Sequence, residues 1–156
     1  MEESIDDISQ NIMTAYIAQM QSALEISNIL LEHNTQSNEL SGDDIICGLI
    51  YRLMIPMNNT EMMESLEEAK KIMDPIESSE SSSDESDESD GYDEIEEKYE
   101  KPSISRKIKT NNCNCDICSR TRVCLINFKD YEPKDQLAQR FKDSITETCN
   151  IHKIYV

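Results

Sequence analysis

Apolar residues recur at three- and four-residue steps through the first thirty or so positions of the chain. The members of this stripe are Ile5, Ile8, Ile12, Tyr16, Met20, Leu24 and Leu31. Such spacing places them on one side of a helix, so an amphipathic helix is expected over residues 4–33. At its end, His33 is interpreted as a favourable helix-end charge.

Two shorter helices are predicted to follow. Ser41 can cap the first of them, over residues 43–55, and Pro56 stops it. Asn59 or Thr60 can cap the next, whose apolar side consists of Met62, Met63, Leu66, Ala69, Ile72 and Met73. Residues 1–76 are therefore predicted to form a helical interaction unit with a Met-rich core that folds on its own. In the alternative, the Met stripe is exposed and receives a partner helix.

Residues 77–105 have a different composition. Between Glu77 and Glu100 there are twelve carboxylates and a single lysine, with serines interspersed. Self-repulsion and low hydrophobicity prevent such a segment from forming a core. We expect a disordered acidic linker that separates two folded parts.

The C-terminal part, residues 106–156, again has a helical period. One apolar face over residues 116–128 comprises Ile117, Thr121, Cys124, Leu125 and Phe128, and a second, after Pro133, comprises Leu137, Ala138, Phe141, Ile145 and Cys149. The short segment between them has the length that joins antiparallel helices. The chain is thus predicted to be mainly α, with a small helical hairpin at its C-terminal end.

Cysteines give this hairpin its candidate chemistry. A C-x-C-x-x-C group, Cys113, Cys115 and Cys118, is followed about thirty residues later by Cys149 and His152. An antiparallel hairpin would bring the start of its first helix beside the end of its second, and soft thiolates with an imidazole suit zinc. The preferred ligands are Cys115, Cys118, Cys149 and His152, with Cys113 as the main rival for one position.

Six cysteines exceed what one closed zinc site can use. Cys124 lies on the predicted inner face of its helix and Cys47 lies in an apolar run, so both are expected to be buried as small apolar side chains. In the alternative reading, all the cysteines are reduced and no metal binds. The zinc reading is preferred because paired ligand spacings rarely coincide with a hairpin by accident.

Charge divides the chain at about residue 100. Four basic residues stand against 26 acidic ones before it, and eleven against six after it, for a net charge of −17. Such a charge opposes general attraction to nucleic acid or anionic membranes. No run of 18 apolar residues occurs and the N-terminus is acidic, so an intracellular protein without a membrane segment is expected.

Residues for common catalytic machinery are missing from the sequence. Three glycines cannot build a phosphate-cradling loop, and the two histidines stand in no recognisable catalytic motif. We therefore expect a protein that is not an enzyme.

Isoleucine at 20 positions, asparagine at 11 and the Ser/Asp/Glu tract resemble small uncharacterised proteins of giant nucleocytoplasmic DNA viruses. That resemblance implies a viral or virion-associated protein but no particular activity. The favoured function is a zinc-stabilised adaptor for protein partners. A nucleic-acid or transcription-associated protein using Arg106, Lys107, Lys109, Arg120 and Arg122 is one alternative, and an acidic chaperone for basic proteins is the other.

Overall fold

The computed structural model describes residues 4–78 and 104–156, with side chains up to residue 74 in the first range. Within these ranges the chain is mainly α, as predicted. The elements are α1 (Ile5–Glu32), α2 (Gly42–Met54), α3 (Asn59–Ser78), β1 (Arg106–Lys107), α4 (Asp116–Asn127), a 3-10 turn η2 (Phe128–Asp130), α5 (Gln136–Ile151) and β2 (Ile154–Tyr155). The expected acidic linker, residues 77–105, lies almost wholly outside the described residues.

Side-chain caps explain where the N-terminal helices begin. Ser4 Oγ accepts a hydrogen bond from the backbone N–H of Asp7 at the start of α1. Ser41 and Asp44 form a reciprocal capping box at the start of α2, which confirms the predicted cap. Before α3 the cap is Asn58 rather than Asn59 or Thr60, since Asn58 Oδ1 accepts from Glu61 N at 2.8 Å.

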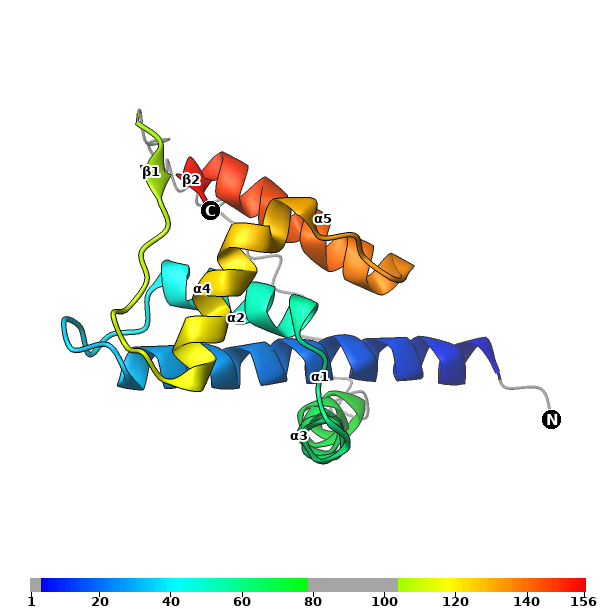
Figure 1. Cartoon of the computed structure of the whole chain (residues 1–156). Helices are drawn as coiled ribbons and strands as arrows, with labels where there is room; N and C mark the ends of the chain where they lie inside the picture. Colours follow the sequence, from blue (N-terminus) through cyan, green and yellow to red (C-terminus); the bar gives the residue numbers. More distant parts are fainter. Residues whose placement is uncertain (1–3, 79–103) are drawn as a thin grey trace, which may run out of the picture.

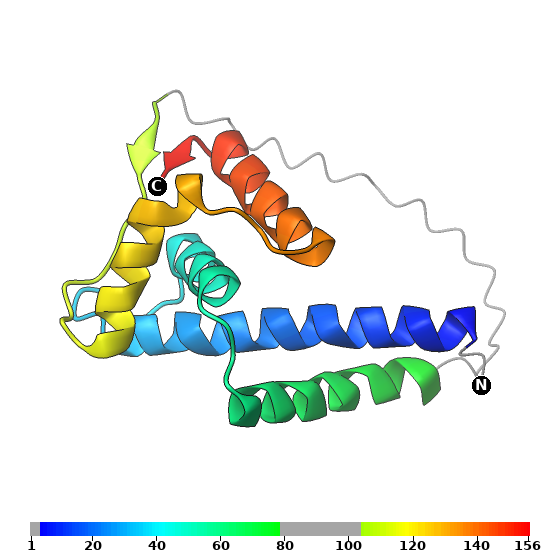
Figure 2. The ribbon, with the colours of Figure 1, turned by 45° about the vertical axis from the view of Figure 1, so that its right-hand side comes forward.

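Helix α2 is the centre of the molecule. It packs against α1 on one side and against α4 and α5 on the other, while α3 runs antiparallel along the N-terminal half of α1 (Figures 1 and 2). Ile50 of α2 is fully buried, and one apolar cluster around it includes Leu30 of α1, Leu125 of α4 and Ile145 of α5. The N-terminal and C-terminal parts therefore share a single core, and independent folding of residues 1–76 stays a prediction.

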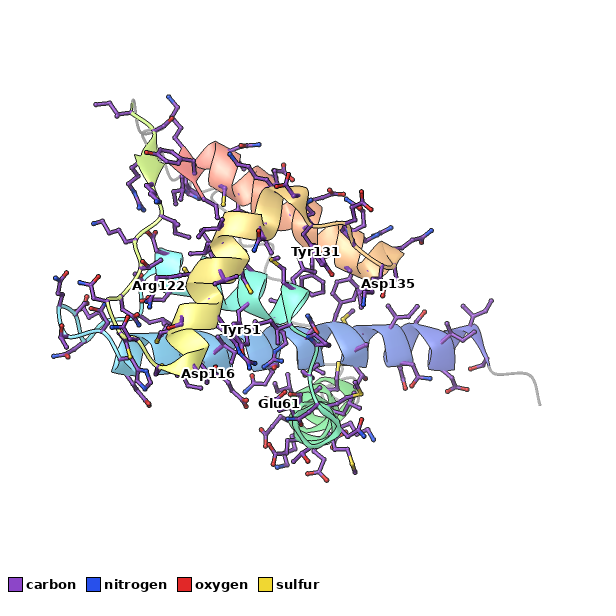
Figure 3. All side chains as sticks on the ribbon, viewed as in Figure 1. Tyr51, Glu61, Asp116, Arg122, Tyr131 and Asp135 are labelled. Atoms are coloured by element: carbon purple, nitrogen blue, oxygen red, sulfur yellow. The ribbon has the colours of Figure 1, made fainter. Side chains whose placement is uncertain are left out.

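Helices α4 and α5 do not form the expected antiparallel hairpin. Both pack on α2, and the start of α4 lies against the end of α1, away from the end of α5 (Figures 1 and 2). Ile145 and Cys149 of α5 join the apolar cluster around Ile50 of α2, so α5 packs on α2 instead of running back along α4. In the connection before α5, the Tyr131 hydroxyl donates to the carbonyl of Leu53 at the end of α2, at 3.2 Å (Figure 3).

A pair of short parallel strands, which the sequence did not indicate, joins the two ends of the C-terminal part. Arg106 and Lys107 of β1 are in register with Ile154 and Tyr155 of β2. Arg106 also forms a bidentate ion pair with the buried Asp43 of α2, with both N–O distances 2.8 Å, and Lys109 N donates to the same carboxylate at 2.7 Å. The segment entering the C-terminal part is thereby fastened to the N-terminus of α2.

In the two described ranges, no helix combines the length and the apolar character needed to cross a membrane.

Helices α1 and α2 approach closely at Gly48, which allows a direct test of the fold. A methyl group there would overlap Ser27 Oγ and the carbonyl oxygen of Ala23 on α1, whereas one at Gly42 would meet nothing within 4 Å. We predict that Gly48→Ala lowers the free energy of unfolding by about 1–3 kcal/mol, measured by urea denaturation. Gly42→Ala, the matched control, should change it little; equal effects of both substitutions would contradict the packing of α1 on α2.

The Asp43–Arg106 pair predicts a pH dependence of stability. The hydrogen bonds from Arg106 outweigh burial and lower the pKa of Asp43, so the pair stabilises the fold above the ordinary aspartate range and loses this contribution as pH falls through the lowered value. At neutral pH, Arg106→Gln should cost about 1–2 kcal/mol of unfolding free energy. The gap between wild type and variant should close on acidification below about pH 4, and a constant gap would show that Arg106 acts otherwise.

Candidate metal site

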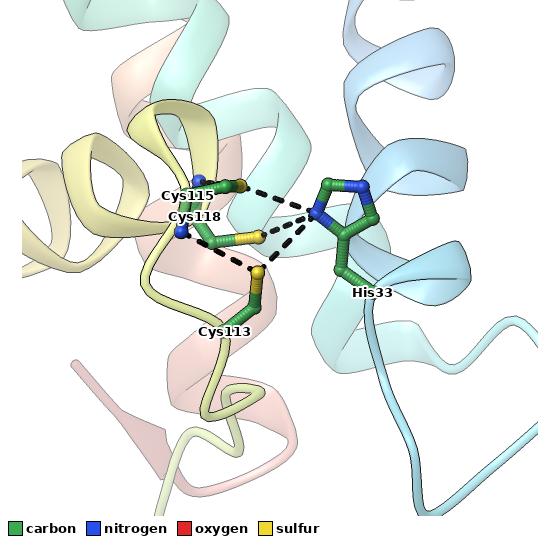
Figure 4. Close-up of side chains that lie close together, drawn as sticks. All are labelled: His33, Cys113, Cys115 and Cys118. Atoms are coloured by element: carbon green, nitrogen blue, oxygen red, sulfur yellow. Dashed lines mark hydrogen bonds between the residues drawn. The ribbon is translucent and has the colours of Figure 1, made fainter.

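Four potential metal ligands converge where the end of α1 meets the start of α4. His33 is the C-cap residue of α1, Cys115 is the N-cap residue of α4, and Cys118 lies in the first turn of α4. Cys113 lies in the loop before α4, and its side chain points toward the other three (Figure 4). Cys118 is buried and the others are half-buried, so the cluster lies at the edge of the shared core.

Distances within the cluster fit a tetrahedral ion better than a set of hydrogen bonds. His33 Nδ1 lies 3.2 Å from Cys115 Sγ and 3.5 Å from the sulfurs of Cys113 and Cys118, and all four ligand atoms lie within 4.8 Å of one another. A single ring N–H cannot serve three sulfurs at once. Ligands around a tetrahedral zinc ion are about 3.5 Å apart for a nitrogen–sulfur pair, as its bond lengths require.

Each of the three sulfurs also accepts a hydrogen bond from a backbone N–H or a side-chain amide. Cys115 N–H donates to Cys113 Sγ and Cys118 N–H donates to Cys115 Sγ, both at 3.4 Å. The Asn111 side-chain amide donates to Cys118 Sγ at 3.3 Å. Such donors orient thiolates and offset part of their negative charge, as the residues surrounding metal ligands commonly do.

Asn111 and Arg122 hold the loop in this shape. The Asn111 amide donates its second hydrogen to the carbonyl of Leu30 in α1 at 2.9 Å, and its oxygen accepts from Cys113 N. Arg122 of α4 donates to the carbonyl oxygens of Asn111 at 3.1 Å and Cys113 at 2.6 Å. One asparagine therefore connects the end of α1, the loop and a candidate ligand.

The electrostatics of the cluster favour a bound cation. The backbone N–H of Cys118, directed at Cys115 Sγ, lowers the pKa of Cys115 to about 6. Burial raises the pKa of Cys118 to about 11. One thiolate therefore forms readily at neutral pH, while a second beside it is unfavourable unless a positive charge offsets both. The arrangement could hold a metal ion.

Of the predicted ligands, the structure brings Cys113, Cys115 and Cys118 together but places Cys149 and His152 elsewhere. Cys149 is buried in the apolar core, where burial raises its pKa, and His152 is the exposed C-cap residue of α5. Both are absent from the cluster because α5 does not run back to the start of α4. Their positions are taken by Cys113, the predicted rival, and by His33.

His33 is the residue that the sequence analysis missed. It was interpreted as a helix-end charge, and its separation of eighty residues from Cys113 gives no paired spacing to detect. The only available signal was its place at the end of a long helix in a chain with two histidines. Cys47 and Cys124, expected to be buried as apolar side chains, are both buried.

Comparisons with known proteins found no matching family model, no similar curated protein and no similar solved structure. The interpretation of the cluster therefore depends on its own geometry.

Asn111 provides a test of the surrounding hydrogen bonds. We predict that Asn111→Ala weakens metal binding about 10- to 100-fold, because Cys118 Sγ loses its donor and the loop loses its attachment to α1. The neighbouring Asn112 is exposed, so Asn112→Ala serves as the matched control and should leave the affinity unchanged. Competition titration with a chromophoric chelator measures the zinc affinity of both variants. Equal affinity of the two variants would contradict the contribution assigned to Asn111.

Proposed function

We propose that this chain is a non-enzymatic interaction protein whose fold is closed by a structural zinc ion bound to His33, Cys113, Cys115 and Cys118. The observation that carries the proposal is the convergence of three sulfurs and one imidazole nitrogen within 4.8 Å, contributed by segments eighty residues apart. An intracellular, reducing environment belongs to the proposal, because it keeps the thiols available as ligands.

The donor set supports zinc in a structural position. Three thiolates and one imidazole match a Cys₃His site, which is closed when all four positions are filled by protein. Catalytic zinc sites instead keep one position for water or substrate. Without an open coordination position, the ion can join α1 to the loop and α4 but cannot activate a reactant.

The location of the cluster supports the same conclusion. Its residues join the end of α1 to the start of α4, two elements that otherwise meet through the core around α2. A metal bond across this junction stabilises the folded state directly, because the ligands are not gathered in the unfolded chain.

The nucleic-acid alternative has less support from the described residues. Arg106 is paired with Asp43, and Arg122 donates hydrogen bonds to backbone carbonyl oxygens. Arg120 Nε lies 3.2 Å from a carboxylate oxygen of Asp116. Three of the five cations considered for nucleic acid thus have protein partners. The acidic-chaperone alternative depends on the Ser/Asp/Glu tract, most of which lies outside the described residues.

Zinc content of matched variants tests the proposal. We predict about one zinc per chain in the wild type and in His152→Gln and Cys149→Ser, and its loss in His33→Gln and Cys118→Ser. Loss of the ion should also lower the free energy of unfolding by at least about 3 kcal/mol when zinc is present well above its Kd. Atomic absorption after dialysis against a weak chelator, followed by urea denaturation, measures both quantities.

Cys149→Ser separates packing from metal binding, because it should destabilise the core and still retain zinc. Zinc-free wild type would overturn the proposal, and zinc loss in His152→Gln with retention in His33→Gln would move the site to the end of α5.

A further inference from the structure

The N-terminal half of α1 presents an apolar stripe, formed by Ile5, Ile12 and Met13, that no described element covers. Every residue from 4 to 13 is exposed, including Ile5 at 82%, Ile12 at 53% and Met13 at 52%. Figure 2 shows why: α3 lies along one side of this half of α1, and α2 and α5 end before reaching its first turns. The stripe continues the helix face that further along packs into the core, so it has the composition of an interface.

An apolar groove begins where this stripe reaches the body of the protein. It has a volume of about 500 Å³ and is lined by side chains of α1, α2 and α5 that include Tyr16, Met20, Leu49 and Phe141. The rings of Tyr16 and Phe141 form one wall, with their centroids 5.2 Å apart. Met20 is 49% exposed at this point.

We propose that the stripe and groove bind the same surface of a second copy of this chain, through antiparallel pairing of the two α1 helices. Positions 5, 9, 12, 13, 16 and 20 share one helix face, and only Ser9 among them is strongly polar. A two-fold pairing centred between Ile12 and Met13 sets Ile5 opposite Met20. The exposed end of each stripe then enters the groove of the other copy, and both copies use the same patch, as a two-fold interface requires.

One cation at the groove, Arg140, can pair with an acidic residue that this register brings to it. Arg140 lines the groove and makes no ion pair with any residue in the described ranges. Asp6, next to Ile5 and exposed, is carried to the partner's groove by the same pairing. Arg140 is the one cation among the residues that line the groove, so it is the residue that would receive Asp6; Asp143 and Glu147, which also line the groove, oppose this approach.

The charge of the chain indicates a reversible dimer. A stable interface buries about 800 Å² per partner from some 20–30 residues. The proposed pairing uses one helix face and a groove, and the net charge of −17 opposes association. Added salt screens this repulsion and should strengthen the dimer. A basic helix from another protein, the rival occupant, would instead bind less tightly in salt.

Sedimentation equilibrium of the zinc-loaded full-length chain, at concentrations up to about 100 μM, tests the proposal. We expect a monomer–dimer equilibrium that strengthens between low and high salt. The double variant Ile5→Asp, Ile12→Asp should raise the dimer Kd at least about tenfold. Ile126→Asp on α4, where the native side chain is 77% exposed, is the matched control and should leave it unchanged.

A charge exchange tests the register. Asp6→Arg and Arg140→Asp should each weaken the dimer, and their combination should restore it. A monomer at every concentration, a dimer insensitive to the Ile5 and Ile12 substitutions, or a dimer in which the charge exchange fails to restore binding would overturn the proposal. Zinc is measured in the same samples, so a monomer with its full zinc content would count against the dimer alone and leave the proposed metal function intact.

Discussion

The fold depends on bringing His33 together with the loop that contains Cys113, across eighty residues that include the acidic segment. Closure of so long a loop carries an entropic cost, which contacts at the junction must offset. Three kinds of contact do so: apolar packing around Ile50, the ion pair of Arg106 with the buried Asp43, and the Asn111 amide that bridges Leu30 and Cys118. A metal ion at the cluster would be the fourth.

This closure explains why the six cysteines fall into two groups. Cys47, Cys124 and Cys149 are buried in the apolar core, and burial raises the pKa of each, that of Cys47 to about 12. Such thiols stay protonated and pack as small apolar side chains. Cys113 and Cys115 lie at the edge of the core, and the sulfurs of these two and of Cys118 accept hydrogen bonds from backbone N–H groups or from the Asn111 amide. The hydrogen bonds that each sulfur accepts, more than its spacing along the sequence, distinguish a candidate metal ligand from a cysteine that only packs in the apolar core.

Local patterns predicted the elements, whereas long-range contacts decided their assembly. The three- and four-residue period identified the helices, and Ser41 with Asp44 located the start of α2. The hairpin prediction failed because α4 and α5 both pack on α2, through long-range contacts that no helical period encodes. The Tyr131–Leu53 hydrogen bond, between residues 78 positions apart, is one of these contacts. For the same reason His33 was missed: Cys149 and His152 have a plausible ligand spacing, but only the fold shows which imidazole reaches the sulfurs.

In the proposed metal site, His33 supplies the nitrogen ligand. Long-range proton–nitrogen correlation spectra of the two histidine side chains, recorded on the zinc-loaded chain and again after chelation, test it most directly. We expect zinc to hold the His33 ring in one tautomer, with Nδ1 on the metal and the proton on Nε2, and to leave the His152 signals unchanged. Zinc-dependent shifts at the His152 ring nitrogens with none at His33 would contradict it.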